Sequence, residues 1–195
     1  MKRSIEDTPI VFIGAGNLAT NLAKALYHKG FRIVQVYSRT MESARTLAEK
    51  VEAEYTTDLQ EISKDAKLYI VSLKDAALVD LLPQITEGKQ SSLLVHTAGS
   101  IPVSIWEGYA ERYGVFYPMQ TFSKQREVNF QEVPFFVEAK RLSIFFLRNR
   151  HIRRKSHRTS SKILFVRLKF RSRTRNINFY VLLHCRLLHC LCYRF

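Results

Sequence analysis

The residues best placed to do chemistry form a glycine-rich turn near the start of the chain. Four apolar residues, 10–13, lead directly into Gly14-Ala-Gly-Asn-Leu-Ala19, which fits the pattern G-x-G-x-x-A. In that pattern the first glycine permits a tight turn, the second lets the backbone approach a pyrophosphate, and the last small residue lets a helix pack closely on a strand. The alternative is a purely structural turn. We predict a dinucleotide-binding loop made by Gly14, Ala15, Gly16, Asn17 and Leu18.

The next strand indicates which dinucleotide fits. Residues 32–37 alternate in β-branched residues and end at Ser38-Arg39-Thr40, where no acid is present. An acid here would bind the ribose 2′-hydroxyl of NAD, whereas a guanidinium and two hydroxyls suit the 2′-phosphate of NADP. We predict NADP as the cofactor, rather than NAD or FAD, with Ser38, Arg39 and Thr40 at that phosphate. The alternative is that Arg39 is a solvated loop residue and Thr40 only a helix cap.

Two further loops follow buried strands and are expected at the same edge of the sheet. They contain Leu73 and Lys74, and then Thr97, Ala98 and Gly99. Ligands of open α/β folds bind at this carboxyl edge, so these residues are predicted to line the nicotinamide ribose and the substrate pocket. Simple turns and helix caps are the alternative.

Other side chains give weaker signals for chemistry. Lys74 could donate a proton, but a single loop lysine is more often solvated. His96 could act as a general acid or base, although a histidine that ends a buried strand is more often structural. The catalytic residues are therefore unknown from the sequence.

The elements that position these loops alternate along the chain. Strands are predicted at residues 10–13, 32–37, 54–56, 68–73, 92–96, 115–117 and 134–137. Helices are predicted between Gly16 and Gly30, after Thr40, at 58–63, from Asp75 to a break or kink at Pro83, and from Pro102 to Gly114. This alternation implies right-handed crossovers and an α/β fold with a doubly wound, mostly parallel Rossmann-like sheet over residues 8–139.

The charge of the chain is concentrated in its last part. The whole chain contains 31 Lys and Arg and 17 Asp and Glu, for a net charge of +14. Residues 140–195 contain 16 of these bases and no acid, so residues 1–139 have 15 bases, 17 acids and a net charge of −2. Residues 140–195 also lack Ala, Gly, Pro, Gln, Met and Trp. We predict that they form an aberrant, irregular basic tail that is either frameshifted or disordered. Resequencing of the DNA around codon 140 would test this prediction.

The composition also limits the compartment and the partners. All three cysteines lie in the tail, so no disulfide is expected in residues 1–139, which fits a reducing compartment. No apolar run is long enough to span a membrane, and Glu6 and Asp7 interrupt any signal peptide, so a cytoplasmic location is expected. His184-Cys185 and His189-Cys190-Leu-Cys192 have metal-ligand residue types without the spacing of a zinc site, and the basic tail is expected to bind nucleic acid only non-specifically.

Several segments together resemble one family. They are the glycine turn, Ser38-Arg39-Thr40, His96-Thr-Ala-Gly-Ser100, Gly114-Val-Phe-Tyr-Pro-Met-Gln-Thr-Phe-Ser123 and Pro134-Phe-Phe-Val-Glu138. Over residues 8–139 the chain resembles NADP-dependent oxidoreductases that have a Rossmann-like domain followed by a helical C-terminal domain of unknown function. It is more distantly similar to pyrroline-5-carboxylate reductase, deazaflavin-dependent NADP reductases and 3-hydroxyisobutyrate dehydrogenases.

The resemblance implies an activity for the whole protein. It implies hydride transfer to or from a small carbonyl, imine or hydroxy-acid substrate, and a homodimer in which the C-terminal domain closes the active site. The long helix expected after Ala139 is not recognisable here. Tyr117 and Gln120 match the family's loop, which gives them no established role. A nucleotide sensor or scaffold without turnover, and an inactive truncated product, are the alternatives.

Overall fold

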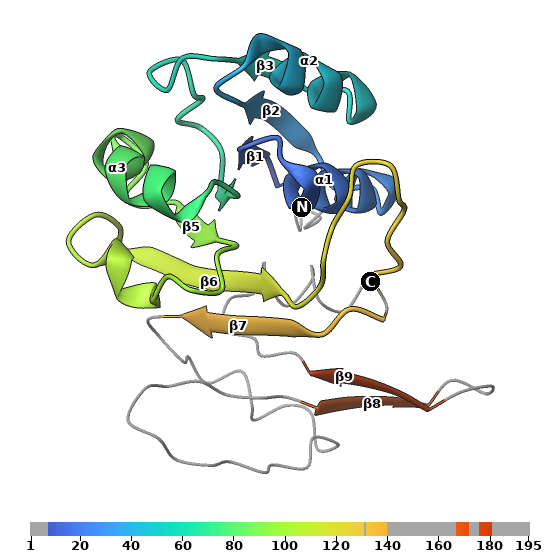
Figure 1. Ribbon diagram of the computed structural model, residues 1–195. Helices are drawn as coiled ribbons and strands as arrows, with labels where there is room; N and C mark the ends of the chain where they lie inside the picture. The colour runs from blue at the N-terminus through green and yellow to red at the C-terminus, as the bar shows by residue number, and fades with distance from the viewer. Residues whose placement is uncertain (1–7, 131, 140–166, 172–175, 181–195) are drawn as a thin grey trace, which may run out of the picture.

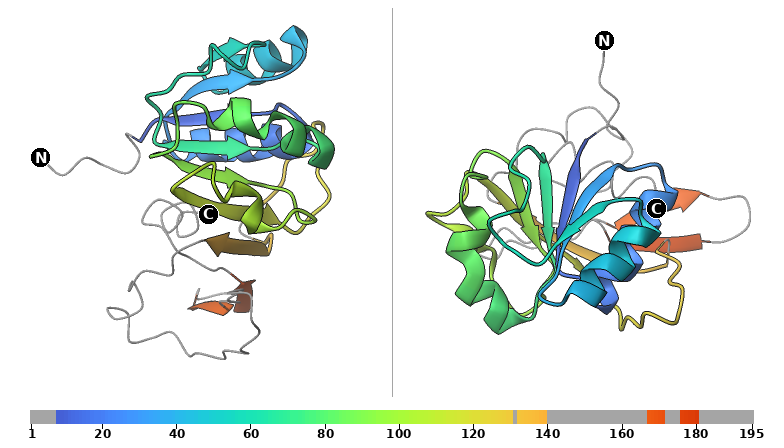
Figure 2. Two further views of the ribbon diagram at one scale, coloured as in Figure 1. Left: turned by 90° about the vertical axis from the view of Figure 1, so that its left-hand side faces the viewer. Right: turned by 90° about the horizontal axis from the view of Figure 1, so that it is seen from above.

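The computed structural model describes residues 8–130, 132–139, 167–171 and 176–180. Its main body is a twisted sheet with helices on both faces (Figures 1 and 2). The strands of this sheet are β1 (Ile10–Ile13), β2 (Ile33–Tyr37), β3 (Glu54–Thr56), β4 (Leu68–Val71), β5 (Leu93–His96), β6 (Arg112–Pro118) and β7 (Phe135–Ala139). The predicted strands are thus all present, and their ends differ from the prediction by at most three residues.

The strand order is β3-β2-β1-β4-β5-β6-β7. Strands β1 to β6 pair in parallel, and β7 pairs antiparallel with β6. The chain therefore winds outward from β1 in one direction and, from β4, in the other, which creates a switch point between β1 and β4. This order confirms the predicted doubly wound, mostly parallel Rossmann-like fold.

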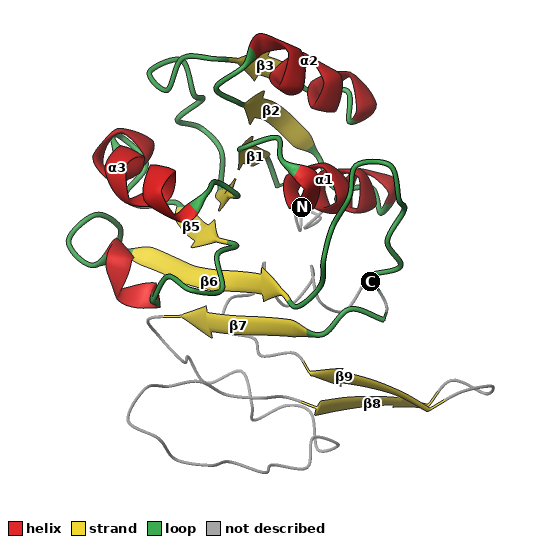
Figure 3. Ribbon diagram, in the orientation of Figure 1, coloured by secondary structure: helices red, strands yellow, loops and turns green. Residues whose placement is uncertain are grey.

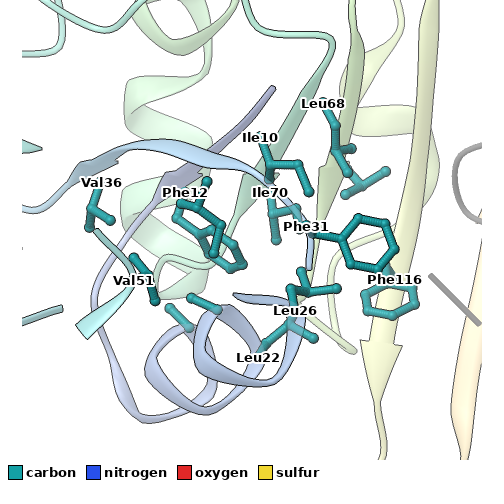
Figure 4. Close-up of a cluster of buried hydrophobic side chains, with 14 of the residues drawn as sticks. Ile10, Phe12, Leu22, Leu26, Phe31, Val36, Val51, Leu68, Ile70 and Phe116 are labelled. Carbon is teal, nitrogen blue, oxygen red and sulfur yellow. The ribbon is translucent and has the colours of Figure 1, made fainter. Parts of the chain in front are cut away.

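Alternate residues of each central strand face opposite sides of the sheet. Ile10 and Phe12 join one buried cluster with Leu68 and Ile70, while Val11 and Ile13 join a second cluster on the other face. Both faces are apolar because parallel strands in the middle of such a sheet are covered on both sides. Figure 4 shows the first cluster, in which Leu22 and Leu26 of the first helix pack on the strands.

Helices α1 (Asn17–His28) and α2 (Met41–Lys50) cover the first face. Helix α3 (Asp75–Thr86) and the short 3₁₀ helix η1 (Val103–Trp106) cover the second face (Figure 3). Helix α1 ends as predicted, with Gly30 at a φ of +83° two residues after His28. Thr40 is the N-cap residue of α2, but its side chain makes no cap hydrogen bond.

Helix α3 corrects one expectation. Pro83 was predicted to end or kink this helix, yet the helix continues from Asp75 to Thr86 with Pro83 inside it. The proline removes the hydrogen bond to the carbonyl of Val79, and Val79 lies on the exposed side of the helix, at 51% exposure, where water can replace that bond. The buried residues Leu78, Leu82 and Ile85 hold the helix on the sheet.

Two other helix predictions are wrong. Residues 58–63 form turns, in which the Asp58 carboxylate accepts a hydrogen bond from the Gln60 N–H at 2.8 Å. The helix expected from Pro102 to Gly114 is only the single turn η1, and Gly114 lies inside strand β6. A Cβ on Gly114 would lie 2.5 Å from the Glu138 carbonyl oxygen, so this glycine lets β7 pair closely with β6.

A long loop, residues 119–134, joins β6 to β7 and arches over α1 (Figure 1). Three of its apolar side chains, Phe122, Phe130 and Val133, complete the first-face cluster at the β6–β7 end of the sheet. Phe130 stacks between Phe122 and Phe135, with ring centroids at 5.8 Å and 6.1 Å. The loop therefore takes the place of a helix at that end of the first face.

In the tail, the described residues form an antiparallel pair, β8 (Arg167–Arg171) and β9 (Asn176–Tyr180), which makes a second, two-stranded sheet. The remaining tail residues lie outside the described part of the chain, and so do the predicted His–Cys segments after residue 180. The division into a domain at 8–139 and a tail remains a prediction. No described helix has the length and apolar character needed to span a membrane.

Candidate functional site

The predicted phosphate loop connects β1 to α1 at the carboxyl edge of the sheet. Gly14 has a φ of +114°, and its N–H donates to the Tyr37 carbonyl at 2.8 Å. A Cβ on Gly14 would collide with the Ser72 carbonyl, because the ends of β1 and β4 meet here. Only glycine combines that backbone conformation with so close an approach.

Gly16 is the N-cap residue of α1, and a Cβ built on it would meet no described atom within 4 Å. The space in front of the helix N-terminus is therefore open at the point where unpaired N–H groups attract an anion. Ala15 is buried and Leu18 packs against the first-face cluster, so these two residues can offer only backbone groups to a ligand. The geometry fits a pyrophosphate.

Asn17, also predicted at the phosphate, has a different contact. Its side-chain Nδ2 donates to the Phe122 carbonyl at 3.0 Å. One turn later, Asn21 Nδ2 donates to the Ser123 carbonyl at 2.8 Å and to the Asn17 carbonyl at 2.9 Å. These asparagines fasten the 119–134 loop to the first turns of α1, so the loop lies next to the phosphate loop.

The predicted 2′-phosphate residues follow β2 at the same edge. Ser38 is buried and its N–H donates to the Thr56 carbonyl at 3.2 Å, while Arg39 and Thr40 are exposed. Burial and the Asp58 carboxylate raise the pKa of Tyr37, and the nearby Arg39 guanidinium opposes that shift. No ion pair occupies Arg39 among the residues that the structure describes, so its guanidinium is available to an anion.

The remaining predicted residues lie around the switch point. Thr97 Oγ1 donates to Ser72 Oγ at 3.1 Å, which ties the end of β5 to the end of β4. Lys74 is exposed as the N-cap residue of α3, and Leu73 packs into the second-face cluster. The Ser100 hydroxyl donates to the Asp75 carboxylate at the start of α3. The structure therefore brings the predicted loops together at one edge.

His96 lies just below this edge and is fully buried, at 0% exposure. Its ring stacks on Trp106 at a centroid distance of 5.9 Å, and neither nitrogen has a hydrogen-bond partner in the described part of the chain. Burial lowers the pKa of His96 to about 4, although backbone groups of Pro102 and Ala98 and the Asp75 carboxylate oppose the shift. An enclosed neutral imidazole of this kind is poorly placed to exchange a proton with a substrate.

A pocket of about 290 Å³ opens beside the edge, on the second face of the sheet. Gly99 and Ile101 contribute from the loop after β5, and the rest of the lining comes from β6, β7 and Met119. A Cβ on Gly99 would lie 2.7 Å from the Tyr117 ring, so glycine allows this ring to lie against the loop. The predicted cofactor residue Gly99 is thus also a wall of the pocket.

Comparison with known proteins shows what the described site is similar to. Residues 9–99 match the family model described as NADP oxidoreductase, coenzyme F420-dependent. The chain is also similar to the crystal structure of a proposed NADP oxidoreductase from Bacteroides fragilis, with 75% identity and a TM-score of 0.69, over 71% of this chain and 54% of that one. Residues 9–99 are therefore similar to an NADP oxidoreductase domain.

More distant relatives share parts of the chain. Glutamyl-tRNA reductase from Methanococcoides burtonii is 30% identical over 96 residues, which make up 47% of this chain and 23% of that protein. A pyrroline-5-carboxylate reductase from Coxiella burnetii has 21% identity and a TM-score of 0.55 over 66% of this chain and 48% of its own, a likeness of fold alone. The chain spans about half the length of these solved structures.

The candidate site also contains residues that the sequence analysis missed. Asn21, Phe136 and Glu138 were given no place in the site, and Tyr117 was noted without a role. The alternation of β7 could have placed Phe136 and Glu138 on one face, opposite Phe135 and Val137. No local pattern marks Asn21, whose partner is Ser123 in a distant loop.

In the described part of the chain, His, Cys, Asp and Glu side chains form no group of three or more that could hold a metal.

Proposed function

We propose that residues 8–139 bind NADP(H) across the carboxyl edge of their sheet, and that the complete protein transfers hydride to or from a small carbonyl, imine or hydroxy-acid substrate. The nicotinamide would supply the hydride chemistry when bound. The protein would contribute the phosphate loop at Gly14–Leu18, the 2′-phosphate contacts of Ser38, Arg39 and Thr40, and the wall formed by Leu73, Lys74 and Thr97–Gly99.

One observation carries the choice of cofactor. Arg39, with no ion pair in the described residues, follows β2 at the edge where the Gly16 turn is open. An acid at that position would repel a 2′-phosphate, and this segment has none. The match of residues 9–99 to a family of NADP oxidoreductases supports the same choice.

Arg39→Glu tests the proposal in the purified chain. We expect the Kd for NADPH to rise about 10- to 100-fold, as expected for the loss of charge-assisted hydrogen bonds to a phosphate. The Kd for NADH should change little, since NADH lacks that phosphate. Both constants can be measured by the fluorescence of the bound nicotinamide. Equal weakening of both cofactors would overturn the assignment.

Arg32→Glu is the matched control. Arg32 is also exposed, but it precedes β2 and so lies at the opposite end of that strand from Arg39. The substitution changes the net charge by the same amount as Arg39→Glu. We expect NADPH affinity to stay near that of the unmodified chain, which separates a local contact from a general effect of charge.

A nucleotide sensor without turnover is the second candidate. The enclosure of His96 favours it, because this is the one histidine at the edge of the site among the residues that the structure describes, and its ring is out of reach of a ligand. The two candidates differ in one measurement. An enzyme oxidises NADPH faster when its substrate is added, whereas a sensor binds NADPH and leaves it unchanged.

A further inference from the structure

The pocket beside the cofactor edge lies on a part of the sheet that the described helices leave open. On the first face, the 119–134 loop covers the β6–β7 end of the sheet. On the second face, α3 and η1 pack over β4, β5 and the start of β6, and the pocket of about 290 Å³ lies beyond them. This volume is large enough for a small organic molecule.

The register of β6 and β7 determines which side chains face the pocket. Val115 pairs with Glu138 and Tyr117 pairs with Phe136, so these four residues point to the same face. The Tyr117 and Phe136 rings lie 6.4 Å apart, centroid to centroid. Together with Ile101 they give the pocket a largely apolar and aromatic wall.

Glu138 is the exception in this wall. Among the described residues that line the pocket, it is the one with a charge, and it is partly buried. Burial raises the pKa of its carboxyl group. No ion pair or side-chain hydrogen bond of Glu138 occurs within the described residues. A carboxylate in apolar surroundings is stabilised most by a cation brought to it.

The position of the pocket connects it to the reaction. Gly99, in the loop predicted to hold the nicotinamide ribose, is also part of its lining. A molecule in the pocket would therefore lie next to the reactive end of the cofactor. In register, Glu138 lies level with Val115 and His96, two residues in from Tyr117 toward the middle of the sheet. Its carboxylate is thus set back from the edge and suited to hold a remote group of the substrate.

We propose that this pocket is the substrate site and that it selects a small molecule with an apolar body and a protonated amine, the amine pairing with Glu138 and the body packing between Ile101, Tyr117 and Phe136. The proposal rests on the proposed function, since it assumes that NADP(H) binds at the adjoining edge. It narrows the substrate to amine-bearing compounds. It also explains why an acidic side chain is present in an otherwise apolar wall.

Two probes of matched shape test the proposal on the full chain without nucleotide. Benzylamine is a cation at pH 7, and benzyl alcohol is its neutral counterpart. By calorimetry or ligand-observed NMR, we expect benzylamine to bind more tightly than benzyl alcohol. Glu138→Gln should weaken benzylamine about tenfold or more, since a hydrogen bond to a charged partner is lost, and leave benzyl alcohol unchanged. Glu138→Asp should restore part of the preference.

Glu132→Gln is the matched control, because Glu132 is an exposed acid just before β7. It removes the same charge and should leave both probes unaffected. Phe136→Ala should weaken both probes alike. Equal binding of the two probes by the unmodified chain, or equal loss with both glutamine variants, would overturn the proposal. A separate NADPH titration of each variant keeps the tests distinct: NADPH binding without amine selectivity refutes only the pocket, and amine selectivity without NADPH binding refutes only the cofactor.

Discussion

His96 is a buried side chain with two polar nitrogens and no hydrogen-bond partner in the described part of the chain. Its environment holds the pKa near 4, against an ordinary value of 6.5. Between pH 6.5 and pH 4 the His96 imidazole is protonated in the unfolded chain but stays neutral in the folded chain. The free energy of unfolding therefore falls as the pH drops from 6.5 to 4. At pH 7 and above, the imidazole is mostly neutral in both states and this loss of unfolding free energy is nearly absent.

The size of this pH effect on the free energy of unfolding can be measured with His96→Leu, because leucine cannot titrate. Between pH 7 and pH 5, we expect the unmodified chain to lose about 2 kcal/mol more unfolding free energy than this variant does, from the difference in pKa. Urea unfolding at the two pH values gives both quantities. His28→Leu is the control, since His28 is exposed at the end of α1. If His96→Leu and the unmodified chain respond identically to pH, the buried imidazole is not the cause.

Residues whose role depends on their immediate neighbours in the sequence could be predicted from the sequence. Gly14 and Gly16 were identified because a glycine pattern between an apolar strand and a helix has one common use. Gly114 was misinterpreted as the end of a helix, because its reason for being glycine is the Glu138 carbonyl of a strand still to come. Glu138 was missed for a similar reason, since its surroundings come from three different segments.

At the scale of elements, the contact between α1 and the 119–134 loop holds the site together. Asn21 makes two hydrogen bonds there, to the Ser123 and Asn17 carbonyls, while being largely buried. We expect Asn21→Ala to cost about 1–3 kcal/mol of unfolding free energy, because a partly buried carbonyl loses its donor. The loosened loop should also be cut faster by trypsin at Lys124 or Arg126, which mass spectrometry of the fragments would show.

Lys24→Ala is the control for that element, since Lys24 also joins α1 to the loop. Its Nζ lies 3.6 Å from Glu127 Oε1, and the Glu127 side chain is 90% exposed. A solvated pair of this kind is worth about 1 kcal/mol or less, so this variant should retain both stability and protease resistance. Similar losses in Asn21→Ala and Lys24→Ala would mean that the asparagine has no special role in anchoring the loop.

Helices and strands were predicted well where their hydrophobic pattern is long. They were predicted less well where contacts with distant segments determine the structure. The leucine spacing of α1 identified both the helix and its end at Gly30. Pro83 was overrated as a helix breaker, because packing of Leu82 and Ile85 keeps α3 on the sheet. The antiparallel direction of β7 was not predicted, since the long loop before it carries no signal of the direction in which the chain returns.

At the scale of the whole molecule, the alternation of strands and helices was enough to predict the doubly wound sheet. The described residues of both apolar clusters lie between Ile10 and Val137. The acids of the chain also end at Glu138, and the excess of positive charge begins after it. The charge therefore changes near Ala139, where the sequence analysis also predicts the end of the domain.

The predicted boundary can be tested with a chain that ends at Ala139. This chain keeps the described residues of both clusters and every residue proposed to contact NADP(H), so we expect cooperative urea unfolding and an unchanged Kd for NADPH. Its net charge becomes −2 instead of +14. Binding of basic side chains to a polyanion such as heparin weakens as the salt concentration rises. The full chain should therefore be retained on heparin at low salt and released as salt rises, while the shorter chain should pass through. Loss of the cooperative transition or of NADPH binding in the shorter chain would show that residues 140–195 are needed by the domain.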